Sequence, residues 1–219
     1  SMAERPNVVL VVADDLGYGD MSCYGATAYR TPHLDYVAER GMRFTDMHSA
    51  CAVCTPSRYG ILTGRYCWRS WLQSFVLGGF GSPLIEPDRP NLASIFKSAG
   101  YATAAIGKWR LGLTWYDKKG GPVAEKERDG WNVEGRGVDY GRGVGGGPLE
   151  LGFDEWFGIS GSLDMPPYCY LDGRACSMLP TEPKAQLYPQ QRPGLASADW
   201  DDQAVDLRLI DRAEEFVDR

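Results

Sequence analysis

The sequence predicts an α/β fold built on a mainly parallel central sheet. Strand-like runs at residues 7–13, 101–106 and 153–159 alternate along the chain with helix-like segments at 31–41 and 91–99. This alternation is typical of a parallel sheet covered by helices. Ligands of such sheets gather beyond the carboxyl ends of the strands, so residues that follow a strand are the first candidates for a site.

The first run, residues 7–13, is continuously aliphatic, as in a strand buried on both faces of a parallel sheet. Asp14 and Asp15 follow it directly. An adjacent acidic pair can also be a solvated turn or a helix cap. Because this strand would deliver the pair to the ligand-binding edge, we expect the two carboxylates to bind a divalent cation, calcium or magnesium.

The next elements are predicted from their end signals. Segment 31–41 begins with Thr-Pro, carries apolar residues at helical spacing and stops at a glycine, which predicts a short helix. Residues 42–48 alternate like a strand. Proline is tolerated in the first turn of a helix, so a helix is expected to begin near Pro56 and to place Cys54 at its N-terminus.

The second half of the chain is less regular. The helix predicted at 91–99 and its following strand lead directly to Lys108, which is either a site residue or an ordinary surface lysine at a strand end. Residues 120–147 are glycine-rich and charged, as in a long surface excursion that shapes a binding site. Segment 165–193 is proline-rich and irregular, whereas 198–219 carries an apolar stripe at helical spacing.

The overall charge limits the classes of partner. The formal net charge of the 219 residues is -6. Nucleic acids and anionic membranes are attracted by clustered excess lysine and arginine, so we expect neither as a partner. No apolar stretch reaches the ~18 to 20 residues of a membrane span, and none is expected. An anionic substrate would therefore have to be captured locally.

The spacing of Cys51 and Cys54 leaves three alternatives open. A C-x-x-C pair is found in redox motifs and in halves of zinc sites, and a buried structural cysteine is also possible. A zinc site needs further ligands, and the chain holds only His33 and His48 as histidines, which we expect to be structural or exposed. The chain has six cysteines, and their redox state stays open.

Longer motifs narrow this interpretation. The run Cys-Thr-Pro-Ser-Arg-Tyr-Gly-Ile-Leu-Thr-Gly-Arg at 54–65 resembles the signature that marks the modified cysteine of the sulfatase family. Residues 100–109 resemble the second signature of that family, residues 6–20 its opening strand and metal loop, and residues 31–35 a further segment. The stretch 152–168 extends the resemblance more weakly.

The resemblance implies an alkaline-phosphatase-like three-layer α/β sandwich with a mainly parallel sheet. We expect residues 4–219 to form the N-terminal part of the catalytic domain. That domain is expected to be incomplete, because the family's distal Asp-Asn metal pair, further basic residues and smaller C-terminal domain are not identifiable after Lys184.

The resemblance also implies the chemistry. In this family the cysteine at the Cys54 position is oxidised to formylglycine by a separate maturation enzyme, and the hydrated aldehyde attacks the sulfur of a sulfate ester. Asp14, Asp15 and the modified Cys54 are then expected to bind the metal, with calcium preferred to magnesium. Arg58 is expected to fix the hydrated nucleophile, and Lys108 to contact a sulfate oxygen.

The expected substrate is a sulfated small molecule or glycan. A carbohydrate sulfate is favoured because the tryptophan- and tyrosine-rich loops within 109–170 are suited to stacking on sugar rings. The formylglycine-generating enzyme is the expected partner during biogenesis. The family resemblance favours a secreted or periplasmic location.

One residue departs from the family pattern. Family members usually continue Gly-Lys-Trp with a histidine, and this chain has Arg110 there. The histidine is thought to handle a proton during sulfate release, and an arginine stays protonated, so Arg110 is expected to position an anion without acting as a base. We therefore predict slow breakdown of the sulfated intermediate, or near-inactivity.

Two other functions remain open from the sequence. A phosphonate or phosphate ester hydrolase would carry the same cysteine signature. A catalytically silent protein that binds sulfated glycans or a partner would account for Arg110 and for the distal ligands that are not identified.

Overall fold

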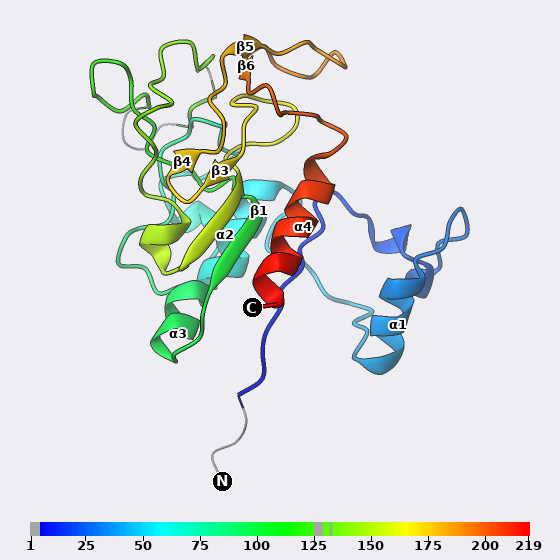
Figure 1. The fold of residues 1–219 in the computed structure, drawn as a ribbon. Helices are drawn as coiled ribbons and strands as arrows, with labels where there is room; N and C mark the ends of the chain where they lie inside the picture. Colours follow the sequence, from blue (N-terminus) through cyan, green and yellow to red (C-terminus); the bar gives the residue numbers. More distant parts are fainter. Residues whose placement is uncertain (1–4, 125–128, 132) are drawn as a thin grey trace. The chain divides into compact units, whose positions relative to one another are not determined.

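The computed structural model describes residues 5–124, 129–131 and 133–219. It divides into two compact units, Ser1–Ser49 and Ala50–Arg219. Figure 1 shows the helices and strands of both units. None of the helices in the described residues is long and apolar enough to cross a membrane.

The first unit holds three short helical elements, η1 (Tyr18–Asp20), η2 (Ser22–Tyr24) and α1 (Pro32–Arg40). The helix predicted at 31–41 is confirmed by α1. Ser22 connects these elements, since its backbone N–H donates to Thr31 Oγ1 at 2.9 Å and its hydroxyl donates to Asp35 Oδ2 at 2.7 Å. Polar bonds therefore organise a unit in which no described residue is fully buried.

The prediction of strands at 7–13 and 42–48 is wrong. Neither segment forms a strand, and the side chains of residues 8–12 are between 44% and 83% exposed. A strand obtains its backbone hydrogen bonds from neighbouring strands, and within residues 5–49 no strand exists to pair with it. Asp14 and Asp15 accordingly lie in a turn instead of at the end of a sheet strand.

The second unit contains the main sheet, in the order β1-β2-β3-β4. Its strands are β1 (Ala104–Lys108), β2 (Glu155–Ile159), β3 (Leu171–Asp172) and β4 (Ala175–Cys176). β1 and β2 are parallel, with Ala104 opposite Glu155 and Lys108 opposite Ile159. The β2–β3 and β3–β4 pairs are antiparallel, so the described sheet is mixed.

β1 begins three residues later than the sequence predicts. Thr103, just before the strand, is hydrogen-bonded to Asp154. Its N–H and hydroxyl lie 2.9 and 3.0 Å from Asp154 Oδ2. The Thr103 hydroxyl also lies 2.9 Å from the Gly152 carbonyl. The Thr103 carbonyl also accepts from the Asp154 and Glu155 N–H groups at 2.8 and 3.2 Å, and regular pairing begins at Ala104.

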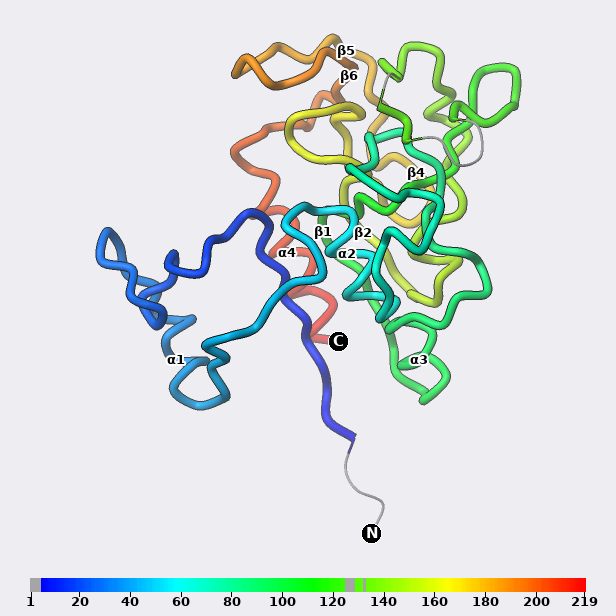
Figure 2. Tube along the Cα trace, turned by 180° about the vertical axis from the view of Figure 1, so that it is seen from behind, coloured from blue at the N-terminus to red at the C-terminus, as the bar shows by residue number. Residues whose placement is uncertain are grey.

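Helices cover both faces of this sheet. Trp156 of β2 packs in a core with Tyr59 of α2 (Cys54–Thr63), whereas Phe157 and Ile159 pack in a second core with Val205 of α4 (Val205–Val217). Alternate residues of a strand point to opposite faces, so the two cores lie on opposite sides. Figures 1 and 2 show α4 on one side of β1 and β2 and α2 on the other. The predicted α/β architecture in three layers is confirmed.

The remaining elements are short. They are η3 (Cys67–Arg69), α3 (Leu92–Ser98), η4 (Pro148–Leu151) and the antiparallel pair β5 (Glu182–Pro183) and β6 (Leu195–Ala196). α3 confirms the helix predicted at 91–99, and β2 the strand at 153–159. In the described part of 120–147 the only pairing is through isolated bridges, as the predicted excursion requires. Residues 125–128 and 132 of that excursion lie outside the described residues.

The last helix begins later than predicted. The apolar stripe of 198–219 includes Trp200, but α4 starts at Val205. Trp200 packs instead against Tyr168 and Tyr170, with ring centroids 5.7 and 5.3 Å away. The backbone N–H of Trp200 donates to the Ser197 carbonyl at 3.0 Å, so this stretch is a packed turn before the helix.

Candidate active site

Cys54 is the first residue of α2, after the extended N-cap Val53. The helix begins two residues earlier than predicted, with Pro56 still in its first turn, and ends before Gly64 in the left-handed conformation (φ 67°). The first N–H groups of a helix have no intrahelical acceptor and carry partial positive charge. The half-buried Cys54 side chain therefore starts at the end of α2 that favours negative charge.

Two side chains of α2 fasten this turn to the carboxyl end of β1. Arg58 Nη1 donates to the Lys108 carbonyl at 2.6 Å. The Thr55 hydroxyl donates to the Arg110 carbonyl at 2.9 Å and accepts from the backbone N–H of Leu77 at 3.1 Å. These bonds hold the segment that contains Cys54 against the segment that contains Lys108.

Thr55 is a contributor that the sequence did not identify. Its side chain is fully buried, so both of its hydrogen bonds are shielded from water. A buried hydroxyl is costly unless it is hydrogen-bonded, and here the single oxygen serves two backbone groups. The signal in the sequence was its place inside the cysteine motif, next to Cys54.

Lys108 is the last residue of β1. The ladder continues past it, because the Trp109 and Arg110 N–H groups donate to the Ile159 and Ser160 carbonyls at 2.9 and 3.1 Å. The backbone around Lys108 is therefore fixed on one side by β2 and on the other by Arg58. The predicted catalytic roles of Lys108 and Arg58 remain predictions.

Arg110 occupies an unusual environment. Its φ is 59°, a left-handed value that costs energy for a residue with a side chain, and only 4% of the residue is exposed. Nη1 lies 2.8 Å from Met165 Sδ and 4.0 Å from Asp164 Oδ1. The guanidinium is 5.8 Å from the Trp131 ring centre. Arg110 is thus a buried cation held by one carboxylate, one thioether and one indole.

A second arginine, Arg192, lies beside Arg110 on the Trp131 ring. Arg192 lies over the same Trp131 ring at 3.9 Å and donates to the Trp131 carbonyl at 2.8 Å. Its backbone N–H donates to the Asp164 carbonyl at 2.8 Å. We call Arg110, Trp131, Asp164 and Arg192 the arginine–tryptophan cluster. The cluster holds two cations and one carboxylate, and the Asp129 carboxylate accepts from the Trp131 N–H at 3.0 Å beside it.

The sequence predicted Arg110 but not its three neighbours in the cluster. Trp131 lies in the excursion whose conformation could not be read, and Asp164 lies in the weaker stretch of the family resemblance. Nothing in the sequence pointed to Arg192. The predicted role of Arg110 in substrate binding remains a prediction.

The predicted metal ligands are split between the two units. Asp14 and Asp15 lie in the first unit and Cys54 in the second, and Asp15 has a φ of 58°. Adjacent carboxylates are the donors that calcium prefers, so the pair fits calcium in kind. Calcium takes about six to eight oxygen ligands, so further donors are required. Within the described residues no group of three or more His, Cys, Asp or Glu side chains is arranged to hold a metal.

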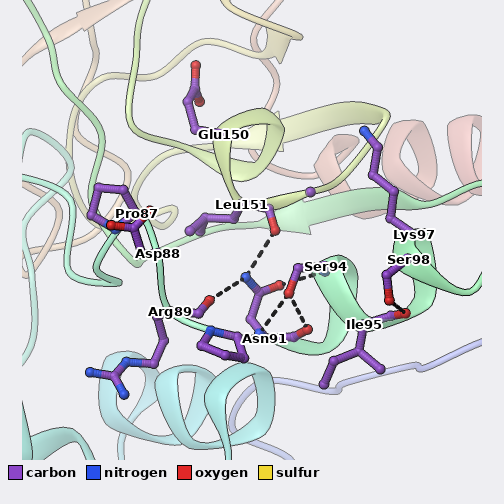
Figure 3. Close-up of a pocket in the computed structure, with 12 residues that line it drawn as sticks. Pro87, Asp88, Arg89, Asn91, Ser94, Ile95, Lys97, Ser98, Glu150 and Leu151 are labelled. Atoms are coloured by element: carbon purple, nitrogen blue, oxygen red, sulfur yellow. Dashed lines mark hydrogen bonds between the residues drawn. The ribbon is translucent and has the colours of Figure 1, made fainter.

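A surface hollow lies at the opposite end of β1 and β2. Figure 3 shows Asn91 between α3 and η4, with its Nδ2 donating to the Leu151 and Arg89 carbonyls at 3.0 and 3.1 Å. The Asn91 side chain also accepts from the Ser94 N–H at 3.1 Å, which caps α3. Asn91 and Ser94 of this hollow hold helices in place, and none of the predicted site residues lines it.

Comparison with known proteins shows which family the chain resembles. The Sulfatase family model matches residues 6–219. The N-acetylgalactosamine-6-O-sulfatase of Bacteroides thetaiotaomicron is 35% identical over 182 residues, which cover 83% of this chain and 32% of that protein. Human steryl-sulfatase is 43% identical over 121 residues, which cover 53% of this chain and 21% of that protein. The chain thus spans about a third or less of the length of these relatives.

A solved structure agrees with the sequence comparisons. A Bacteroides thetaiotaomicron sulfatase from work on the metabolism of multiple glycosaminoglycans superposes with a TM-score of 0.78 and 28% identity. The match covers 98% of this chain and 48% of that chain. The three-layer α/β architecture, the cysteine motif at the start of α2 and the family match over residues 6–219 together show that the chain belongs to the sulfatase family.

Proposed function

We propose that the protein hydrolyses sulfate esters, with a nucleophile made from Cys54. The observation that carries the proposal is the pair of hydrogen bonds from Thr55 and Arg58 to the backbone around Lys108. They join the two family motifs at one end of β1, where the helix N-terminus and the strand-end lysine meet. The cysteine motif alone would support only membership of the family.

The proposed nucleophile is a formylglycine formed from Cys54 by a maturation enzyme. The positive end of α2 would stabilise negative charge that develops at this position. Arg58 would hold the nucleophile while its bond to the Lys108 carbonyl limits its motion, and Lys108 would contact a sulfate oxygen. Asp14, Asp15 and Cys54 are the residues that would hold calcium, which supplies positive charge beside the reacting group when bound.

A carbohydrate sulfate is the proposed substrate class. The relative matched over 83% of this chain is an N-acetylgalactosamine-6-O-sulfatase, whereas the human steryl-sulfatase match covers 53%. The two arginines of the arginine–tryptophan cluster are the residues that would contact an anionic ligand. Residues 4–219 would form the N-terminal part of the catalytic domain. A secreted or periplasmic location is also proposed, and fractionation of the native host would test it.

Two measurements on one preparation test the proposed activity. The protein is produced with a formylglycine-generating enzyme, and peptide mass spectrometry determines whether the Cys54 thiol has become an aldehyde. Release of sulfate and of phosphate is then compared on matched aryl esters. The proposal predicts conversion of Cys54 and preference for the sulfate ester. Preference for phosphate would support the phosphohydrolase alternative, and an unconverted Cys54 would support the silent binding protein.

A substitution at Arg110 tests whether this residue slows breakdown of the sulfated intermediate or leaves the protein catalytically silent. A buried arginine beside Asp164 keeps its charge, so it cannot take up a proton during sulfate release. Arg110→His suits the backbone, because histidine tolerates left-handed φ better than most residues. We expect the variant to raise the steady-state rate more than the single-turnover rate. Equal rates for the two proteins in both regimes would overturn this role for Arg110.

A further inference from the structure

Two cysteines outside the cysteine motif lie in contact. Cys169 Sγ donates to Cys176 Sγ at 3.8 Å, and both residues are thiols in this structure. Cys169 is fully buried and Cys176 is half-buried. Neither side chain takes part in the proposed reaction, so their contact has no explanation there.

The β3–β4 hairpin holds the pair together. Leu171 is opposite Cys176, and alternate residues share a face, so Cys169 and Cys176 lie on the same face of the hairpin. The turn contains Gly173 at a φ of 60°, and the Ser177 N–H donates to the Tyr170 carbonyl at 3.0 Å. The backbone on both sides of the two thiols is therefore fixed by ladder and turn.

We propose that Cys169 and Cys176 form a disulfide bond that restricts the chain segment supporting the arginine–tryptophan cluster of the candidate active site. The sulfur atoms have to close from 3.8 Å to the ~2.05 Å of a disulfide bond, a change within the reach of small side-chain rotations. The proposal does not depend on sulfatase activity, because it concerns bonding between two residues that the reaction leaves unused.

The link to the site runs through the residue before Cys169. The Tyr168 hydroxyl donates to the Arg192 carbonyl at 2.6 Å, and its N–H donates to the Leu195 carbonyl at 3.1 Å. Arg192 belongs to the arginine–tryptophan cluster. A covalent ring closed at Cys169 would therefore restrict the chain that supports this cluster.

The oxidation needs a disulfide donor, and glutathione disulfide is a suitable one. The hydrogen bond from Cys169 lowers the pKa of the half-exposed Cys176 thiol, which makes it the first to react. Its thiolate attacks one sulfur of glutathione disulfide and releases one glutathione thiolate. Cys169 then loses its proton, attacks the Cys176 sulfur and releases the second glutathione. Two thiols are oxidised to one disulfide while one disulfide is reduced to two thiols.

Tryptic mapping of the full chain tests the proposal directly. Arg174 lies between the two cysteines, so trypsin separates them into peptides 143–174 and 175–184. The protein is equilibrated with glutathione disulfide, alkylated, and digested without reduction. We expect these two peptides to be joined by a disulfide and to separate on reduction. Alkylation of both cysteines, or linkage of either to another cysteine of the chain, would overturn the proposal.

Unfolding measurements give a second, independent readout. A disulfide that closes so short a ring is expected to raise the midpoint of thermal unfolding by roughly 5 °C, and a reductant should remove this gain. Cys176→Ser should show no response to the reductant. Cys23→Ser, which changes a cysteine of the first unit, should respond as the unaltered protein does. An equal response of Cys176→Ser and the unaltered protein would contradict the assignment.

Discussion

The two ends of the β1–β2 pair use similar hydrogen bonds for different purposes. At the amino end, Asn91, Thr103 and Asp154 bond to backbone groups of neighbouring elements and fix where β1 and α3 begin. At the carboxyl end, Thr55 and Arg58 also bond to backbone groups, but they fix the turn that begins with Cys54.

The two ends differ in the residues that they bring together. The amino end has a surface hollow in which Asn91 caps α3, and beside the hollow Asp154 binds Thr103 just before β1. The carboxyl end has the helix N-terminus, the strand-end Lys108 and the two arginines of the arginine–tryptophan cluster. None of the predicted site residues lines the hollow, and substitutions at the two ends test their roles separately.

The largest effect is expected from Cys54→Ala at the carboxyl end. Removal of the nucleophile precursor should lower sulfate release by at least about a thousandfold. The free energy of unfolding should change little, because the side chain is only half-buried. Urea unfolding and steady-state assays on the same preparations check both parts, with Cys23→Ala as the control. Turnover close to that of the unaltered protein would remove Cys54 from the proposed reaction.

Thr55→Val should lower both stability and activity. The substitution keeps the shape but leaves the Arg110 carbonyl and the Leu77 N–H without the hydroxyl they share, at a cost of about 2 to 3 kcal/mol. Thr55→Ser keeps the hydroxyl and should lose less than half as much. If urea unfolding gives equal losses for the two variants, the hydrogen bonds are not what Thr55 contributes.

Asn91→Ala at the amino end should destabilise the protein by about 2 kcal/mol, because it removes the cap of α3 and the bond to the Leu151 carbonyl. The kcat/KM of the folded protein should stay within about twofold. Asn91→Asp keeps the acceptor for the cap and should recover part of the stability. A large fall in kcat/KM at full folding would show that the two ends are not separable.

Asp154→Asn should produce the smallest effect, and one that depends on pH. Hydrogen bonding to Lys97 holds the pKa of Asp154 below its usual range. A lowered pKa in the folded state stabilises the protein above the unfolded pKa of about 3.9, and this is lost as pH falls through the folded value. The fall in unfolding midpoint between pH 6 and pH 3 should therefore be smaller in Asp154→Asn. An identical fall in both proteins would exclude this contribution.

The sequence by itself determined the family and the local elements. The motif around Cys54 was sufficient to identify the sulfatase family, because it combines several residue types at fixed spacing. The helices α1 and α3 were predicted from their caps and glycine stops, and α2 from the proline in its first turn. These signals are local, so they can be read without knowledge of the tertiary structure.

Only the tertiary structure decided how distant segments meet. Residues 7–13 have the composition of a buried strand, but a strand forms only where another strand pairs with it. The neighbours of Arg110 come from segments more than twenty residues away, and a sequence pattern does not report such contacts. The same holds for Thr55, whose importance comes from burial, and for Cys176, whose distance from Cys169 is fixed by the turn between them.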